Sequence, residues 1–183
     1  PEFRDRIRLA ARWIGASAVK PDVDDKVVAL CTAVEALLAS KSDGLKGEII
    51  AIRSMLLPLS IDECFTDPFP LYALYKRRSE VIHGTKLGVC GDEDYRLLHF
   101  EATLILKHIM VLLKKHGELK KFDDFVQLIE TADGLKHAEG WFARYGKAAK
   151  NVVKAAQARS ERVQKHCRAD QDHLGKGVPS WKE

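Results

Sequence analysis

The stretch "KVVALCTAVEALLAS", Lys26 to Ser40, decides the fold class of this chain. Its apolar residues recur three and four positions apart, which is the spacing of one face of an α-helix. They form a wide stripe: Val27, Leu30, Cys31, Val34, Leu37 and Leu38. Glu35 is the only charged residue of the stretch after Lys26, so it is stranded among apolar neighbours. We predict a helix that begins near Asp22 or Asp24, where acidic residues complement the helix N-terminus, and ends near Ser40.

Helical spacing continues on both sides of this stretch, and no segment alternates as a β-strand would. Pro58 should end the helix before it, and Asp92 should cap the longest helix. The other predicted helices are Arg4–Val19, Leu45–Leu57, Pro70–His83, Glu93–His116, Phe122–Thr131 and Glu139–His166. The sequence therefore predicts an all-α protein, an antiparallel bundle of four to five helices with a basic, helical C-terminal extension.

Composition and charge divide the chain into a bundle and this extension. The first residues, "PEF", resemble a cloning remnant, which would make the chain a piece of a longer protein; we leave residues 1–3 out of the predicted fold. The bundle is predicted over residues 4–118 and the extension over residues 119–183. Residues 1–135 carry two more acidic than basic side chains, whereas residues 136–183 carry six more basic than acidic ones. The net charge of +4 therefore originates at the C-terminal end.

The sequence predicts neither a membrane span nor a metal site. No apolar run is long enough to cross a bilayer, and the start of the chain lacks the regions of a signal peptide. The cysteines are scattered without a C-x-x-C pair, which favours a reducing cytoplasm: Cys31, Cys64, Cys90 and Cys167. The local zinc candidates, His166, Cys167 and His173, lack the paired spacing of tetrahedral sites. We therefore expect no metal and no other cofactor.

A second stretch, "YALYKRRSEVIHGTK" at residues 72–86, contains the candidate functional residues. Arg78 falls within the apolar face of the predicted helix 70–83, where an unpaired guanidinium would be costly to bury. Glu35 is stranded in the same way on its own helix. A partly buried ion pair between Arg78 and Glu35 would resolve both problems, and a catalytic role for Arg78 stays open beside it.

His83 also has two interpretations. It directly precedes Gly84, the residue type that most easily adopts the left-handed conformation closing a helix, and it lies at the negative end of the helix dipole. Five residues separate it from Arg78, which places the two about 140° apart around an ideal helix. On spacing alone, helix capping is the favoured role of His83, and catalysis is the alternative.

The run "LYKRRSEVIHG" follows "AVEALLAS" on one earlier helix and "EIIAIRSMLL" on the next. In this order, over about residues 27–115, the segments resemble the Apea-like branch of the HEPN superfamily, and the most specific element is Arg-x4-His followed by Gly. The resemblance implies a helical bundle that forms a homodimer in which the two motifs face each other. It also implies metal-independent endoribonuclease activity, as found in toxins, antiviral defence and RNA processing.

Position by position, the resemblance assigns the signature places to Arg78 and His83, and the polar place between them to Ser79, where other branches often have Asn, Asp or His. RNA cleavage without metal needs a base for the 2′-hydroxyl, an acid for the leaving 5′-oxygen and a cation for the phosphate. Histidine and arginine suit these tasks. One motif supplies one histidine, so the site would be composite across the dimer and release a 2′,3′-cyclic phosphate.

Several cations are candidates for holding the RNA backbone. They are Lys76, Arg77 and Lys86 beside the motif, and Arg144, Lys147, Lys150 and Lys154 in the extension. Each of the first group could equally be a solvated helix cation, and the extension could dock on an acidic partner or serve as a linker. We predict a dimeric ribonuclease with RNA as substrate and an antitoxin or further domains of a longer chain as additional candidate partners. The alternative is a non-catalytic HEPN-like module for dimerisation or for binding RNA or protein.

Overall fold

The computed structural model describes residues 2–40, 43, 46–63, 67–84, 88–117, 119–131 and 133–136. The chain divides into two compact units, residues 1–130 and 131–183. Over the described residues the structure is helical, without strands, which confirms the predicted all-α class. The predicted helix Glu139–His166 lies outside the described residues. No helix of the described part combines the length and apolar character that crossing a bilayer requires.

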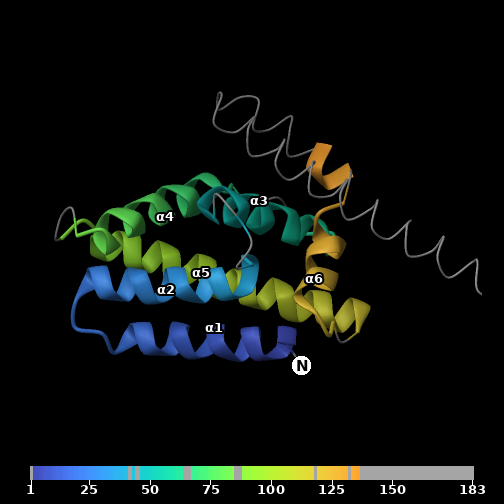
Figure 1. The fold of residues 1–183 in the computed structure, drawn as a ribbon, viewed down its shortest axis with the longest axis horizontal. Helices are drawn as coiled ribbons and strands as arrows, with labels where there is room; N and C mark the ends of the chain where they lie inside the picture. Colours follow the sequence, from blue (N-terminus) through green and yellow to red (C-terminus); the bar gives the residue numbers. More distant parts are fainter. Residues whose placement is uncertain are drawn as a thin grey trace, which may run out of the picture. The chain divides into compact units, whose positions relative to one another are not determined.

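Six helices form the described part of the first unit (Figure 1). They are α1 (Glu2–Ala18), α2 (Val23–Leu38), α3 (Lys46–Leu59), α4 (Phe69–Ile82), α5 (Asp92–His116) and α6 (Phe122–Ile129). In Figure 1, α1 and α2 run antiparallel, joined at one end by the turn around Pro21. The Asp22 side chain caps α2 by accepting the backbone N–H of Asp24 at 2.8 Å. This local capping explains why the predicted start of α2 is correct.

The core is built around α2, which packs against α1, α4 and α5. All six residues of its predicted apolar stripe are buried: Val27, Leu30, Cys31, Val34, Leu37 and Leu38. Each large aliphatic side chain buried in this way stabilises the fold by about 1.5–3 kcal/mol relative to an exposed one. The facing helices contribute Leu74 of α4 and Leu98 and Ile105 of α5, which are also buried. The helical periodicity of the sequence therefore identified the core face of α2.

Glu2 and Phe3 are part of the helical bundle, although we left residues 1–3 out of the predicted fold. Helix α1 begins at Glu2, and the Phe3 side chain is fully buried. Its ring stacks on Phe125 with 4.7 Å between ring centroids, and it lies 6.1 Å from the ring of Phe122. Because α6 contributes both of these partners, the first unit extends to residue 130 rather than ending at residue 118.

Two helix ends also differ from the prediction. Pro58 lies inside α3, which continues to Leu59, because the hydrogen bond that proline removes falls in the last turn. Gly91, rather than Asp92, is the N-cap of α5. The capping carboxylate comes from Asp94, which accepts the backbone N–H of Gly91 at 2.9 Å. This carboxylate satisfies the backbone N–H of the N-cap residue itself, and its negative charge lies at the positive end of the helix dipole.

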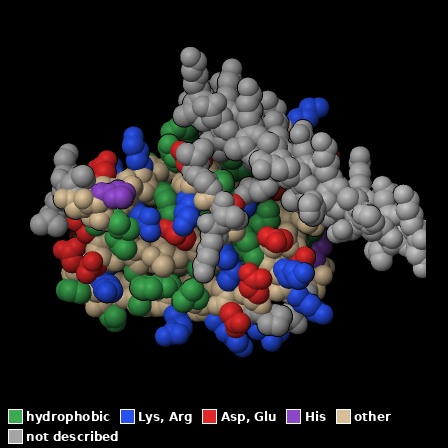
Figure 2. All heavy atoms as spheres, in the orientation of Figure 1, with side chains coloured by type: hydrophobic (Ala, Val, Ile, Leu, Met, Phe, Trp, Pro, Cys, Tyr) green, Lys and Arg blue, Asp and Glu red, His purple; other side chains and the backbone are tan. Residues whose placement is uncertain are grey.

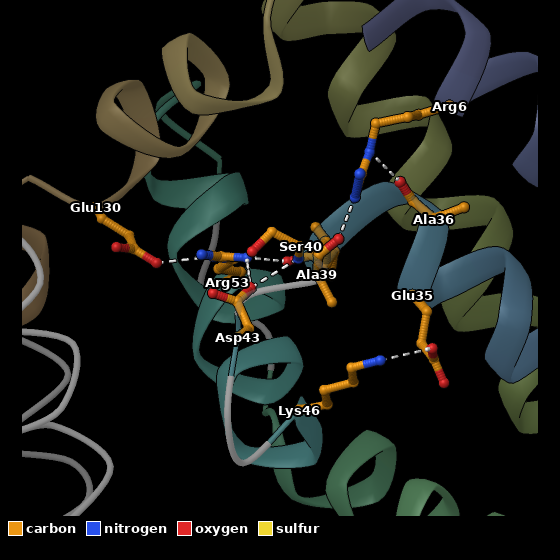
Figure 3. Close-up of polar contacts among 10 residues, drawn as sticks. Arg6, Glu35, Ala36, Ala39, Ser40, Asp43, Lys46, Arg53 and Glu130 are labelled. Carbon is orange, nitrogen blue, oxygen red and sulfur yellow. Dashed lines mark hydrogen bonds and ion pairs between the residues drawn. The ribbon is translucent and has the colours of Figure 1, made fainter. Parts of the chain in front are cut away.

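A buried arginine ties the C-terminal end of α2 to distant segments (Figure 3). The Arg53 side chain of α3 is 1% exposed; its Nε donates to Glu130 Oε1 at 2.8 Å, and its Nη1 donates to Asp43 Oδ2 at 2.8 Å. Nη1 also donates to the Leu38 carbonyl, one of the unpaired carbonyls at the end of α2. Arg6 of α1 caps the neighbouring carbonyls of Ala36 and Ala39 in the same way. The two guanidinium groups thus donate hydrogen bonds to the carbonyl groups at the C-terminal end of α2.

Two glycine substitutions should change stability in opposite directions. Gly84 follows α4 with φ +64°, and an added Cβ would meet no atom there, so alanine should cost about 1 kcal/mol from backbone strain alone. Gly15 lies inside α1 and also has open space, so Gly15→Ala should stabilise by about 0.5–1 kcal/mol. Urea unfolding of both variants measures the two changes. A destabilised Gly15→Ala or a stabilised Gly84→Ala would contradict this account.

Candidate active site

Arg78 and Glu35 form the ion pair that the sequence predicted. Arg78 Nη2 lies 2.8 Å from Glu35 Oε1, and the two side chains are 25% and 19% exposed. The pair therefore joins α4 to α2 near the surface of the bundle, not in its centre. Arg78 Nε is buried and has no hydrogen-bond partner among the described residues. The guanidinium is thus held on one side by Glu35, in a side chain that is a quarter exposed.

Glu35 has two further partners that hold its carboxylate in place. The Tyr75 hydroxyl donates to Glu35 Oε1, and Lys46 Nζ lies 3.8 Å from Oε2 (Figure 3). Burial, followed by the hydrogen bond to Glu35 and its negative charge, raises the pKa of Tyr75 well above its usual value. The phenol therefore remains protonated and acts as a donor at neutral pH. Its ring also lies under the Arg78 guanidinium, 5.4 Å from Cζ to the ring centroid.

Cys31 is the apolar neighbour of this cluster. It lies one helical turn before Glu35 on α2 and is 1% exposed. Burial raises the pKa of the Cys31 thiol to about 12, although the positive charge of Arg78 acts in the opposite direction. The thiol is therefore neutral at physiological pH, and Cys31 packs as the small hydrophobic residue that its place in the stripe predicted.

His83 is the C-cap of α4, and its side chain is exposed. Its backbone N–H donates to the Ser79 carbonyl at 3.1 Å, and Gly84 follows with positive φ. The predicted capping geometry is therefore present in the backbone. Capping leaves the imidazole at the surface, at the end of the helix that also carries Arg78. Ser79, which lies between Arg78 and His83 in the sequence, is half-buried.

The cations beside the motif differ in their surroundings. Lys76 is exposed on α4. Arg77 is held at the N-terminus of α5, where its Nη1 lies 2.5 Å from both carboxylate oxygens of Asp94. Among the described residues, Arg77 therefore has an ion pair and Lys76 has none. Five predicted RNA-binding residues lie outside the described residues: Lys86, Arg144, Lys147, Lys150 and Lys154.

A buried aspartate anchors the segment that follows the motif. Asp24, in the first turn of α2, accepts the backbone N–H of Gly88 at 2.8 Å and of Cys90 at 2.9 Å. Burial alone would raise the pKa of Asp24, but these N–H groups and the Cys90 thiol outweigh it and lower the pKa below its ordinary value of 3.8. The end of the α4–α5 connection is therefore fixed to α2 through a carboxylate that must be ionised.

Asp24→Asn should destabilise the protein by about 1–3 kcal/mol at neutral pH, because the amide keeps one acceptor but turns an NH2 group toward the second N–H. A carboxyl group whose pKa is lower in the folded than in the unfolded protein stabilises the fold at pH values above the unfolded pKa. This stabilisation is lost as the pH falls through the folded pKa. The difference from the wild type should therefore shrink below about pH 3.8. Unfolding free energies across acidic pH test this. Asp25→Asn, on the exposed side of the same turn, is the control and should show no such convergence.

The contacts of three residues, in or near this cluster, were not predicted from the sequence. Tyr75 follows Leu71 and Leu74 at the spacing of an apolar helix face, although its place one turn before Arg78 could have indicated a shared partner. Lys46 and Asp24 gave no local signal, because their partners lie on other segments. The described residues contain no group of three or more His, Cys, Asp and Glu side chains that could hold a metal ion.

Comparison of the chain with protein-family models, with curated proteins and with solved structures found no match. The resemblance to HEPN proteins therefore rests on the residues of the motif and on their order along the chain.

Proposed function

We propose that this protein is a metal-independent endoribonuclease of the HEPN type, acting in the cytoplasm in defence or as a toxin. One observation supports this most: the imidazole of His83 is exposed at the end of α4, and Arg78, five residues earlier, has a side chain that is held by Glu35 and is 25% exposed. Imidazole transfers protons near neutral pH, and a guanidinium stays charged and matches the geometry of a phosphate.

The proposed chemistry uses two copies of the site. In one copy, His83 removes the proton of the 2′-hydroxyl, and the 2′-oxygen attacks the adjacent phosphorus. In the other copy, a protonated His83 gives its proton to the leaving 5′-oxygen, so the products are a 2′,3′-cyclic phosphate and a 5′-hydroxyl end. Arg78 stabilises the charge that develops on the phosphate oxygens, and Ser79 offers a hydroxyl nearby. Exposed Lys76 can hold the RNA backbone beside the motif.

A second function is favoured by the same ion pair. Because Arg78 is bonded to Glu35 and His83 caps its helix, both residues also fit a non-catalytic module that forms dimers or binds RNA or protein. The two functions differ in what they require of Arg78. A purely structural arginine needs only Glu35, whereas the nuclease also needs the Arg78 guanidinium to contact a phosphate.

The decisive experiment combines a solution mass with a cleavage assay. The purified protein is incubated with structured RNA in EDTA, and its mass is measured by light scattering at the same concentration. The nuclease predicts a dimer and fragments ending in 2′,3′-cyclic phosphate. A monomer, or a dimer that leaves the RNA intact, would leave the binding module as the function.

A further inference from the structure

A groove between α1 and the C-terminal half of α5 has no role in the proposed nuclease. Its volume is about 420 Å³, which falls in the range of small-molecule sites. Its apolar walls are formed by Phe3 and Ile7 of α1, Met110 and Leu113 of α5, and Leu119. Met110 and the start of α5 are separated by about 27 Å of helix, at about 1.5 Å per residue, so the groove is remote from the end of α4 that carries the motif.

The base of the groove is tightly packed, and its rim is open to solvent. Phe3 is fully buried and stacked within the aromatic cluster with Phe122 and Phe125. Met110, in contrast, is 54% exposed, although its flexible thioether side chain adapts well to irregular apolar partners. An apolar ligand that covered Met110 would therefore remove hydrophobic surface from water without disturbing the aromatic cluster.

The rim of the groove is basic. Arg4 and Arg8 lie on α1 and Lys114 lies on α5, so cations stand on both walls, and no described lining residue is acidic. Figure 2 shows Lys and Arg side chains, with Asp and Glu side chains among them, along the edge of the molecule where α1 lies. Arg8 pairs with Asp5 at 3.3 Å, but both side chains are 68% exposed. Such a surface pair contributes little, so Arg8 can exchange its partner for a bound anion.

We propose that this groove binds an amphiphilic anion, a molecule with an alkyl tail and a single carboxylate, as in a fatty acid. The tail would lie against Ile7, Leu113 and Met110, and the carboxylate would face Lys114 and Arg8. The apolar walls account for the tail, and cations on both sides of the opening account for the negative head. The assignment does not depend on the nuclease, because no residue of the motif lines the groove.

The two methionines of the chain make a direct test possible. Met110 lines the groove, whereas Met55 is fully buried in α3 and does not line it. The protein is labelled with carbon-13 at the methionine methyl groups and titrated with decanoate below its critical micelle concentration. The Met110 signal should shift in a saturable way while the Met55 signal stays in place. A Met110 signal that does not move, or equal movement of both signals, overturns the proposal.

Charge is tested separately from the tail. Decyltrimethylammonium has the same tail and the opposite head charge, and it should bind at least about tenfold more weakly than decanoate, because like charges at the rim repel it. Lys114→Gln should weaken decanoate binding about two- to fivefold, the effect of one partly exposed ion pair. Arg12→Gln, an exposed cation of α1 outside the groove, should change nothing. Equal binding of the two amphiphiles, or no effect of Lys114→Gln, rules out an anion site.

Discussion

In the proposed nuclease, replacing His83 with alanine should lower the rate of RNA cleavage in EDTA by at least about 10²-fold, because each proton-transfer partner typically contributes about 10²–10⁴. In a homodimer the substitution removes both histidines, so the attacking and the leaving oxygen lose their partners together. The loss should appear in the rate rather than in folding. His83 is exposed, and the backbone hydrogen bond that caps α4 is retained by alanine. The unfolding free energy should therefore stay within about 0.5 kcal/mol of the wild type.

His116 provides a matched control for this experiment. It is also exposed and also ends a helix, as the last residue of α5. His116→Ala should therefore leave cleavage unchanged. This result would show that losing an arbitrary surface histidine is not sufficient to lower the cleavage rate. The measurement follows the appearance of fragments with 2′,3′-cyclic phosphate ends at equal protein concentration. Cleavage that persists in His83→Ala at the wild-type rate would remove His83 from the site and end the nuclease assignment.

Replacing Arg53 with methionine should destabilise the protein by about 3–5 kcal/mol, the usual result of breaking a buried ion pair. Methionine fills much of the same volume but removes the positive charge of Arg53 from beside the buried carboxylates of Asp43 and Glu130. It also leaves the Leu38 carbonyl, at the end of α2, without one of its donors. The effect should appear as a lower midpoint in urea unfolding, with the slope of the transition unchanged.

Arg8→Met is the control, because Arg8 makes an ion pair of the exposed kind and should change stability by no more than about 0.5 kcal/mol. A second variant separates the lost charge from the lost packing. Adding Asp43→Asn and Glu130→Gln to Arg53→Met removes the two buried negative charges and should recover part of the stability. A loss below about 1 kcal/mol in Arg53→Met would show that the network does not hold these segments together.

The Arg78–Glu35 pair was predictable, and the reason is physical. Each residue interrupts an otherwise apolar helix face, so each needs a partner of opposite charge. The two residues have opposite charges, and they pair in the structure. The other members of the cluster carried no such signal. Tyr75 reads as an ordinary core aromatic, and the bond from its hydroxyl to Glu35 exists only because α4 lies beside α2.

The sequence by itself determined the helical class, the buried stripe of α2 and most helix boundaries, because these depend on residues within one or two turns of each other. Only the tertiary structure decided that Phe3 and α6 share an aromatic cluster, that Asp24 anchors the connection after α4, and that Arg53 meets Glu130. Periodicity reveals which face of a helix is buried. It does not reveal which distant side chain lies opposite, since that depends on how the packed helices cross.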